Sequence, residues 1–362
     1  MSFLRRMFGR SDDIEHHHSN VPVPGWDAIN AALEPLYGDE EPLHWGTMVR
    51  WRMGGPDPLD GVSAHRAEGP PPHWHYVSYG LSELYDKESD DPALSGWGME
   101  LTFRLARAAS DDQAPVWPVS LMQNLARYVF ESGNVLAVGD HIDLNGPIAL
   151  DEPTEIRAVA FTEDEQLGTI DTPHGSVTFV QIVGLTMDEY EAAQDWDTSA
   201  LLGVLRSSAT LLVTDLSRRS ILIDPETAAT VQGATARDGS SMAEIHCDDL
   251  EWSISGDRMD VAIGATAVPR LLRMLRGRLP FDRPFFVQGP SMRLDVTPGE
   301  ALDWHDAGDG TLHLTLSPAE VDRIGTTLEP IAGSYPVSPR LSFTVRRSVI
   351  TDRQGREVEV VG

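Results

Sequence analysis

The sequence predicts a two-domain protein of the α+β (mixed α/β) class, in which each domain is a mixed sheet flanked by helices. Three features favour this class: a length of 362 residues, short apolar or alternating runs typical of strands, and separate stretches with helical spacing. A chain of this length is too long for one ordinary domain and sufficient for two, each with its own core. No repeat of roughly 20–50 residues is visible, which argues against a solenoid or a propeller.

The first part of the chain is expected to contain an arm followed by a domain. Residues 1–20 are predicted to be disordered, because charged residues and three consecutive histidines occur there without apolar periodicity. Residues 21–206 are predicted to form the first domain, with helices at Trp26–Leu36 and Pro118–Ser132. Between these helices, Gly54–Asp60 is expected to be an ordered structural loop, since its prolines fix φ and its glycines permit tight turns.

Two patterns predict strands in this domain. Apolar residues alternate with polar ones in Met99–Leu105, which is typical of a strand with one buried face. Val177–Leu185 is a near-continuous apolar run, short enough for a buried strand. Thr186 and Glu189 then have the spacing of a capping box, so we expect a helix from there through Ala193.

A weak linker at residues 207–210 separates this domain from a second one, predicted at residues 211–362. Ser317–Glu320 combines a capping box with a proline at the first helical position, which predicts a helix start. Strands are predicted at Leu211–Thr214, Ile221–Ile223, Leu312–Leu316 and Leu341–Val345.

Composition excludes several classes of partner. The chain has 56 acidic and 28 basic residues, for a formal net charge of −28. Such a charge repels phosphate backbones, so we expect no nucleic-acid partner, whereas it speeds the encounter with a basic protein. The single cysteine, Cys247, excludes an internal disulfide and any multi-cysteine metal site. No apolar run approaches the ~20 residues that span a bilayer, so we expect no membrane partner and a cytoplasmic location.

No catalytic signature is found in the sequence. The nucleophile elbow, the phosphate-binding loop and the dinucleotide-binding glycine motif do not occur. The best metal candidates are His73 and His75, which would share one face of a strand, with His141 or Asp140 completing the site. The alternative is that one of these two imidazoles is buried and hydrogen-bonded while the other lies at a surface. We expect no catalytic residue, no cofactor and no bound metal.

Several blocks of residues occur in an order and spacing that resemble the amino-terminal domain of the Suppressor of fused family. The resemblance is strong from about Gly54 to Trp196 and weak beyond residue 240. The blocks are Met53–Asp60, His73–Tyr85, Gly96–Leu105, Trp117-Pro118, Leu125–Phe130 and Gly139–His141.

The resemblance implies a protein that holds another protein and does not turn over a substrate. In animal members, a Ser-Tyr-Gly-His-Leu segment of a Gli-type transcription factor lies as an added strand in a cleft between the two domains, which is β-augmentation. Carried over to this sequence, the resemblance implies that Tyr128 and Asp140 bind the partner. Helical spacing places Tyr128 on the side of Leu121 and Leu125, with its hydroxyl at the rim. For Asp140 the alternative is a capped turn.

The partner itself is left open by the sequence. Abundant alanine, arginine, aspartate and leucine with scarce lysine indicate a GC-rich bacterial gene. Bacterial members of the family have been proposed as immunity proteins, for which the partner would be a toxin, and the acidic charge suits a basic one. Our first expectation is therefore a non-enzymatic module that captures a peptide or partner domain. The alternatives are a bacterial immunity protein and, third, a metal-dependent enzyme.

Overall fold

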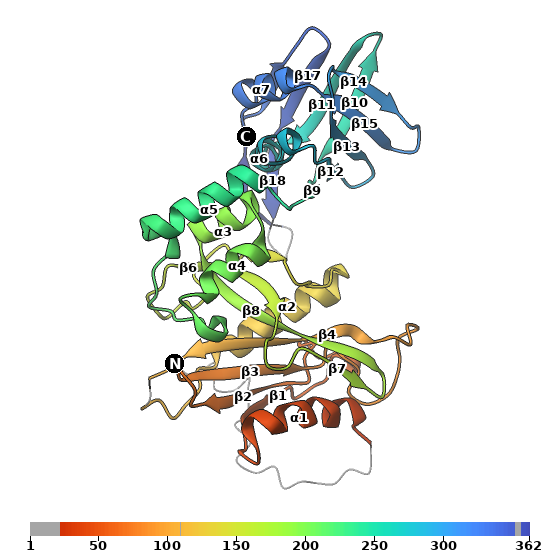
Figure 1. The fold of residues 1–362 in the computed structure, drawn as a ribbon. Coiled ribbons are helices and arrows are strands. Elements are labelled where there is room, and N and C mark those ends of the chain that lie inside the picture. The colour runs from red at the N-terminus through yellow and green to blue at the C-terminus, as the bar shows by residue number, and fades with distance from the viewer. Residues whose placement is uncertain (1–21, 109, 352–355) are drawn as a thin grey trace. The chain divides into compact units, whose positions relative to one another are not determined.

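The structure is a computed structural model of the chain and is shown in Figure 1. It describes residues 22–108, 110–351 and 356–362. The expected disordered arm at residues 1–20, with its three histidines, lies outside these ranges. Helices and mixed sheets occur throughout the described chain, which confirms the predicted α+β class.

The chain divides into two compact units. Unit 1 extends to Glu191 and includes Thr198–Ala228, whereas unit 2 comprises Ala192–Asp197 and Ala229–Gly362. The expected division into domains at residues 206–211 stays a prediction, because compactness alone does not show which segments fold on their own.

Unit 1 is built on a mixed sheet of eight strands within the described residues. β4 and β8 run parallel at its centre, while the other neighbouring strands pair antiparallel. β7 (Thr169–Thr172) pairs with β8 outside the main order. That order is β1 (Leu43–Gly46), β2 (Gly61–Ala67), β3 (His73–Tyr79), β4 (Leu94–Ala106), β8 (Gly175–Thr186), β6 (Ile156–Glu163) and β5 (His141–Asp143).

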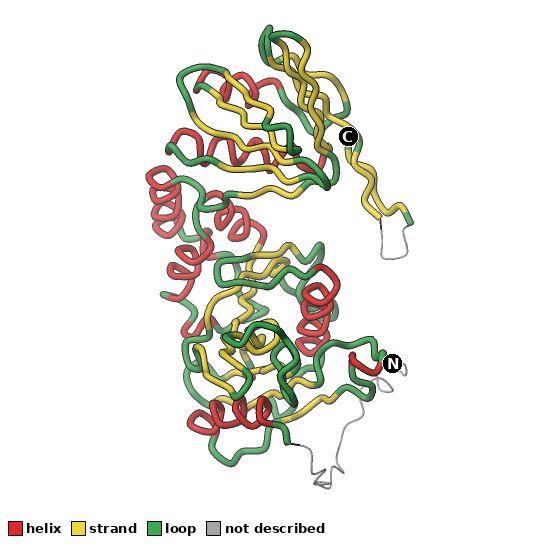
Figure 2. Tube along the Cα trace, turned by 90° about the vertical axis from the view of Figure 1, so that its right-hand side faces the viewer, coloured by secondary structure: helices red, strands yellow, loops and turns green. Residues whose placement is uncertain are grey.

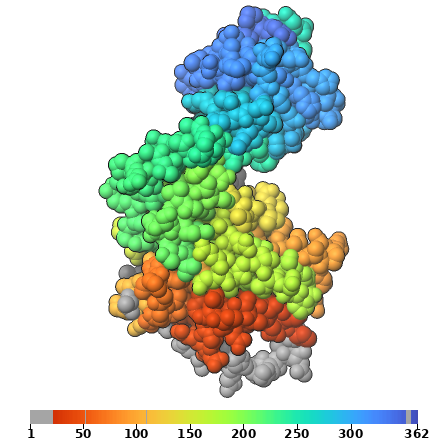
Figure 3. Space-filling model, viewed as in Figure 1, coloured from red at the N-terminus to blue at the C-terminus, as the bar shows by residue number. Residues whose placement is uncertain are grey.

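The two helices predicted for the first domain are confirmed as α1 (Pro24–Tyr37) and α2 (Trp117–Ser132). They cover opposite faces of the sheet, as Figures 1 and 2 show. In β3, Tyr76 packs in the core that α2 covers, while the next residue, Val77, packs in the core beneath α1. This alternation is the period of two that a strand buried on both faces requires. The outer side of α1 forms the red surface of unit 1 in Figure 3.

Two short strands predicted beyond residue 210 are wrong. Leu211–Thr214 begins with the 3-10 helix η3 (Thr210–Leu212), and Ile221–Ile223 is itself the 3-10 helix η4. Leu211 has φ of 55° and Leu212 has φ of 49°, in the left-handed region that no strand uses. The remaining helix of unit 1 is α4 (Thr198–Arg206), while α3 (Met187–Asp195) and α5 (Pro225–Asp238) have residues in both units. The capping box predicted before α3 is confirmed, because Thr186 N donates to Glu189 Oε2 at 3.0 Å.

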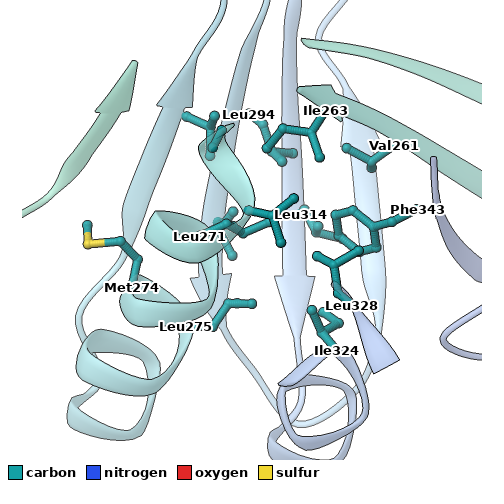
Figure 4. Packing of buried hydrophobic residues seen from close by; sticks show 14 of the residues in the cluster. Val261, Ile263, Leu271, Met274, Leu275, Leu294, Leu314, Ile324, Leu328 and Phe343 are labelled. Atoms are coloured by element: carbon teal, nitrogen blue, oxygen red, sulfur yellow. The ribbon is translucent and has the colours of Figure 1, made fainter. Parts of the chain in front are cut away.

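Unit 2 holds two larger sheets and two helices around one core (Figure 4). Leu271 and Leu275 of α6 (Val268–Arg278) and Ile324 of α7 (Pro318–Thr327) pack on the strands. The five-stranded sheet has the order β14 (Asp303–Asp306), β15 (Thr311–Leu316), β13 (Arg293–Pro298), β12 (Phe285–Gln288) and β9 (Glu244–His246). The four-stranded sheet has the order β10 (Leu250–Ser255), β11 (Arg258–Gly264), β17 (Leu341–Arg346) and β16 (Gly333–Pro336). The strands predicted at Leu312–Leu316 and Leu341–Val345 and the helix start at Ser317 are confirmed.

Candidate partner-binding site

Tyr128 lies near the end of α2, the helix that buries its other face in the core of unit 1. Its side chain is 41% exposed, whereas Leu121 and Leu125 are buried. Tyr128 was expected on the same side of the helix as Leu121 and Leu125, but it lies at the margin of that buried side. Its hydroxyl accepts a hydrogen bond from Asn134 Nδ2 at 3.2 Å. The ring thus presents an apolar surface with one polar atom, a combination common at protein interfaces.

Asp140 lies in the turn that leads from α2 into β5. Gly139 before it has φ of 95°, which a residue with a side chain rarely adopts. The Asp140 carboxylate is exposed and accepts a hydrogen bond through Oδ2 from Ala137 N at 2.8 Å. Its other oxygen, Oδ1, has no hydrogen bond to the described part of the chain. The turn cap considered for Asp140 is therefore present, and one carboxylate oxygen is still open to a ligand.

Tyr128 and Asp140 are the two exposed ends of one segment of the chain. The segment between them carries two exposed valines, Val135 at 46% and Val138 at 50%. Sequence reasoning missed both, because an exposed valine has no distinguishing pattern. We call these four residues the α2–β5 surface. It combines apolar side chains with an aromatic ring and a carboxylate.

The α2–β5 surface continues into the edge of the sheet. β5 pairs with β6 on one side only, among the residues that are described. The first residue of β5, His141, contacts Thr198, whose Oγ1 lies 3.0 Å from the ring Nδ1. An edge strand exposes unpaired backbone N–H and C=O groups, which can accept another strand. This edge begins directly after Asp140.

The histidines considered for a metal site do not come together. His73 and His75 are on β3, whereas His141 is on β5, with β4, β8 and β6 between them in the sheet. Within the described residues, no group of three or more histidine, cysteine, aspartate or glutamate side chains has a geometry that holds a metal. The expectation that one of the β3 imidazoles lies at a surface is wrong. His73 is 2% exposed and His75 is 0% exposed.

These imidazoles belong to a buried polar cluster beneath α1. His75 Nδ1 lies 2.7 Å from the Tyr37 hydroxyl, and its Nε2 lies 3.2 Å from Asp164 Oδ2. Burial, together with the positive charge of Arg104, lowers the pKa of His75 to about 3. Burial alone would raise the pKa of Asp164, but hydrogen bonds from His75 and Arg104, together with the positive charge of Arg104, hold it well below its usual range. The cluster therefore contains a buried ion pair, Arg104 and Asp164, beside neutral imidazoles.

His65 completes this cluster and was not identified from the sequence. It lies opposite His75 in the pairing of β2 with β3, and its ring stacks on Tyr37 at 4.5 Å between centroids. Neither ring nitrogen of His65 has a hydrogen-bond partner in the described chain, and burial lowers its pKa to about 4. No local pattern marks this histidine, because its neighbours come from distant parts of the sequence.

Comparison with known proteins identifies the family. The family model described as Suppressor of fused protein (SUFU) matches residues 55–219, which include the whole α2–β5 surface. A human protein named Suppressor of fused homolog is 38% identical over 271 residues, covering 68% of this chain and 55% of the human protein. The chain belongs to the Suppressor of fused family. It spans about half the length of the curated relatives it matches.

Two solved structures of Suppressor of fused proteins extend this result. The crystal structure of Drosophila Suppressor of Fused matches with a TM-score of 0.73 and 24% identity, covering 90% of this chain and 97% of that one. At that identity the match shows the shared fold. A chain of the Sufu–Fu complex crystal structure is 35% identical, with a TM-score of 0.55, and covers 58% of this chain and 98% of its own. That relative is thus a protein that forms a complex with Fu.

Proposed function

We propose that this chain is a non-enzymatic protein-binding module that captures an extended peptide or a partner domain. The segment would lie in the cleft between the two domains, with the α2–β5 surface as the wall contributed by the first. The observation that carries the proposal is the exposed Asp140 carboxylate directly before β5, a strand that pairs only with β6 in the described part of the sheet. The complex formed by the relative in the Sufu–Fu structure supports binding of a protein as the shared activity.

Each part of the α2–β5 surface, and the strand β5 next to it, would have a separate role. The edge of β5 supplies main-chain hydrogen bonds to an added strand, which give affinity without sequence preference. Asp140 Oδ1 accepts a charge-assisted hydrogen bond from a basic or histidine side chain of the partner. Tyr128, Val135 and Val138 provide the apolar contact around it. A rigid aromatic ring is well suited to this role, since little side-chain freedom is lost on binding.

The proposed partner is basic, and in a bacterial cell it would be a toxin that this chain neutralises as an immunity protein. The formal net charge of −28 supports this form, because complementary charge accelerates association. We expect to find a gene for a basic toxin domain beside the gene for this chain. Co-expression of this chain should abolish the toxicity of that domain. Full toxicity in the presence of this chain would contradict the immunity form and leave the binding proposal to its own test.

The binding proposal is tested by three substitutions, two at Asp140 and one at a matched position outside the α2–β5 surface and β5. Asp140→Asn keeps an acceptor for the Ala137 N–H but removes the charge, whereas Asp140→Ala removes both. Asp91→Asn is the matched control, since Asp91 is also exposed and caps a turn, accepting from Ala93 N at 2.8 Å. The partner is captured from cells of the source organism with the unmodified chain, and its affinity for each variant is then measured.

We expect both Asp140 variants to weaken binding about 10- to 150-fold, because a hydrogen bond to a charged group contributes about 1.5–3 kcal/mol. The Asp91→Asn control should bind like the unmodified chain. The melting temperature of Asp140→Ala should fall only by the amount that corresponds to the lost hydrogen bond from Ala137 N. Full affinity in Asp140→Asn, with a lower melting temperature in Asp140→Ala, would show that Asp140 is only a turn cap.

A further inference from the structure

Two histidines lie side by side on the outer face of the five-stranded sheet of unit 2. His305 of β14 is directly opposite His313 of β15 in the antiparallel pairing of these strands. Their neighbours Trp304 and Leu314 also form a pair, and both pack against the core of the unit, as Figure 4 shows for Leu314. Because successive side chains of a strand point to opposite faces, the two histidines point away from this core. Both are exposed.

The two imidazole rings are close enough to share one metal ion. Their centroids lie 6.2 Å apart, and their planes differ by only 7°. A Zn²⁺ ion lies about 2.0–2.1 Å from each nitrogen that binds it, which places the centroids of two imidazoles on one ion on the order of 5–6 Å apart. Directly opposed residues keep their Cβ atoms close whatever the rotamer of each ring. A small rotation of the rings, with the strands in place, therefore brings one nitrogen of each onto the same ion.

A carboxylate on the next strand orients one of the two rings. Asp295 of β13 lies opposite His313 on the side away from His305, and its Oδ2 is 3.3 Å from His313 Nδ1. Its Oδ1 accepts a hydrogen bond from Arg293 Nε at 2.6 Å, which keeps the carboxylate in place. A carboxylate beside Nδ1 favours the neutral tautomer with the proton on that nitrogen. His313 Nε2 is then left with a lone pair, as in the histidine ligands of many zinc sites.

The remaining nitrogens of the pair have no other contact. Within the described residues, His305 forms no hydrogen bond or ion pair, and His313 forms only the ion pair with Asp295. We propose that His305 and His313 together bind one divalent transition-metal cation such as Zn²⁺, with Asp295 as the positioning residue for His313. Imidazole nitrogens suit zinc, copper and nickel, whereas magnesium and calcium prefer oxygen ligands.

The proposed site is an open one. The described residues contain no group of three or more side chains that holds a metal, so two imidazoles are the protein ligands and water takes the other positions. In the described part of its sheet, β14 pairs with β15 only. A metal held by one residue from each strand cross-links this edge strand to its neighbour. Opening of β14 must then release the metal, so the bound ion stabilises the edge.

The experiment is a calorimetric titration of the full chain with Zn²⁺, in the absence of any other ligand. His305→Gln and His313→Gln each remove one of the two proposed ligands. Three consecutive histidines near the start of the chain could bind Zn²⁺ themselves. Every protein in the titration therefore has alanine in place of His16, His17 and His18.

His246→Gln is the matched control. His246 is an exposed histidine beside a carboxylate, since its Nε2 lies 2.8 Å from Glu244 Oε1, but β13 and β12 separate its strand from β15. We expect the His305 and His313 variants to bind Zn²⁺ at least about tenfold more weakly and the His246 variant to bind it with full affinity. Full affinity in either variant of the pair, or an equal loss in the control, would reduce the site to an adventitious ion only and overturn the proposal.

The role of Asp295 has its own test. Asp295→Asn keeps an acceptor for Arg293 but removes the charge beside His313 Nδ1. Loss of such a partner typically weakens metal binding about 10–100-fold, so we expect at least a tenfold loss of Zn²⁺ affinity. The melting temperature without metal should stay nearly the same. Unchanged Zn²⁺ affinity in Asp295→Asn would refute the positioning role.

Two measurements separate chelation by the pair from the general attraction of an acidic chain for cations. The formal net charge of −28 attracts any cation, so Mg²⁺ at the same concentration is the control, and we expect it to leave Zn²⁺ binding unchanged. Displacement of Zn²⁺ by an equal concentration of Mg²⁺ would overturn the proposal. Electron paramagnetic resonance of bound Cu²⁺ should show two imidazole nitrogens in the unmodified pair and one in His305→Gln. A single nitrogen in the unmodified pair would also overturn it.

Hydrogen exchange tests the cross-link between the strands. Zn²⁺ at ~100 times its Kd should slow exchange of the β14 amides about tenfold or more, and should not do so in His305→Gln. Exchange in β14 that Zn²⁺ leaves unchanged would refute the cross-link. Asp140→Ala should bind Zn²⁺ like the unmodified chain, so failure of this site and failure of the α2–β5 surface are separate results.

Discussion

The buried histidines beneath α1 predict that acid destabilises unit 1. His65 and His75 have pKa values lowered by burial to about 4 and about 3, against 6.5 for an exposed imidazole. In the unfolded chain each imidazole takes up a proton as the pH falls below 6.5, whereas in the folded chain it stays neutral. The unfolded state therefore binds more protons between about pH 6.5 and pH 4, and stability is lost as the pH falls through that window.

The size of this effect follows from the two pKa values. Between pH 7 and pH 5, an imidazole with a folded pKa of about 4 lowers the free energy of unfolding by about 2 kcal/mol. His75 contributes in the same direction, so acid costs more stability than His65 alone accounts for. This is a large fraction of the stability of an ordinary domain.

The substitution His65→Phe isolates one of these contributions. The His65 ring stacks on Tyr37 and makes no hydrogen bond within the described chain, so phenylalanine preserves the contact while removing the titrating group. Urea unfolding followed by tryptophan fluorescence at pH 7 and pH 5 gives the loss of stability on acidification. We expect this loss to be about 2 kcal/mol smaller in His65→Phe, and unchanged in the exposed control His305→Phe. An equal loss in His65→Phe and the unmodified chain would refute the reasoning.

Three further predictions concern stability. Arg104→Met leaves the Asp164 carboxylate buried without the guanidinium that pairs with it. The free energy of unfolding in urea should therefore fall by about 3–5 kcal/mol. A loss below about 1 kcal/mol would contradict this. Gln123 forms hydrogen bonds to both the N–H and the C=O of Leu59. Gln123→Leu should therefore speed hydrogen exchange of the Leu59 amide by roughly tenfold or more. Unchanged exchange would show that the Gly54–Asp60 loop is held by other contacts. Leu314→Ala opens a cavity in the core of unit 2 and should cost about 2–5 kcal/mol by thermal denaturation, whereas a cost near zero would mean that the core closes over it.

The helices and long strands of unit 1 were predictable because each carries its own period. α1 ends at Gly38, which has φ of 59°, and α2 begins with a proline in its first turn, as their sequences indicated. The short apolar runs at Leu211–Thr214 and Ile221–Ile223 were not predictable in the same way. A run of three or four apolar residues fits a strand or a single helical turn equally well, and the left-handed backbone at Leu211 is fixed by tertiary contacts.

The buried histidines show a second limit of sequence reasoning. Their positions on β3 were correct, but their burial depends on Tyr37 and Asp164, which come from α1 and from the residue after β6. A histidine pair with local spacing therefore resembled a metal site until its distant partners were known. Tyr128 and Asp140 were inferred through family resemblance, because one exposed tyrosine and one turn aspartate have no pattern of their own.

The acid-sensitive cluster and the α2–β5 surface are connected through the same sheet. β3, which carries His75, and β5, which follows Asp140, are joined by β4, β8 and β6. Asp164 follows directly after β6, and its backbone N–H donates to Phe179 of β8 at 2.8 Å. Protonation of His75 would place a second buried positive charge beside Arg104 at the point where these central strands meet, whereas Asp140 is exposed at the edge. Acid should therefore release a bound partner only through loss of the fold. For a partner that binds Asp140 through lysine or arginine, affinity should stay constant between pH 7 and pH 5 until unfolding begins, and an affinity that changes in a still folded chain would show that the partner makes this contact through a titrating group such as histidine.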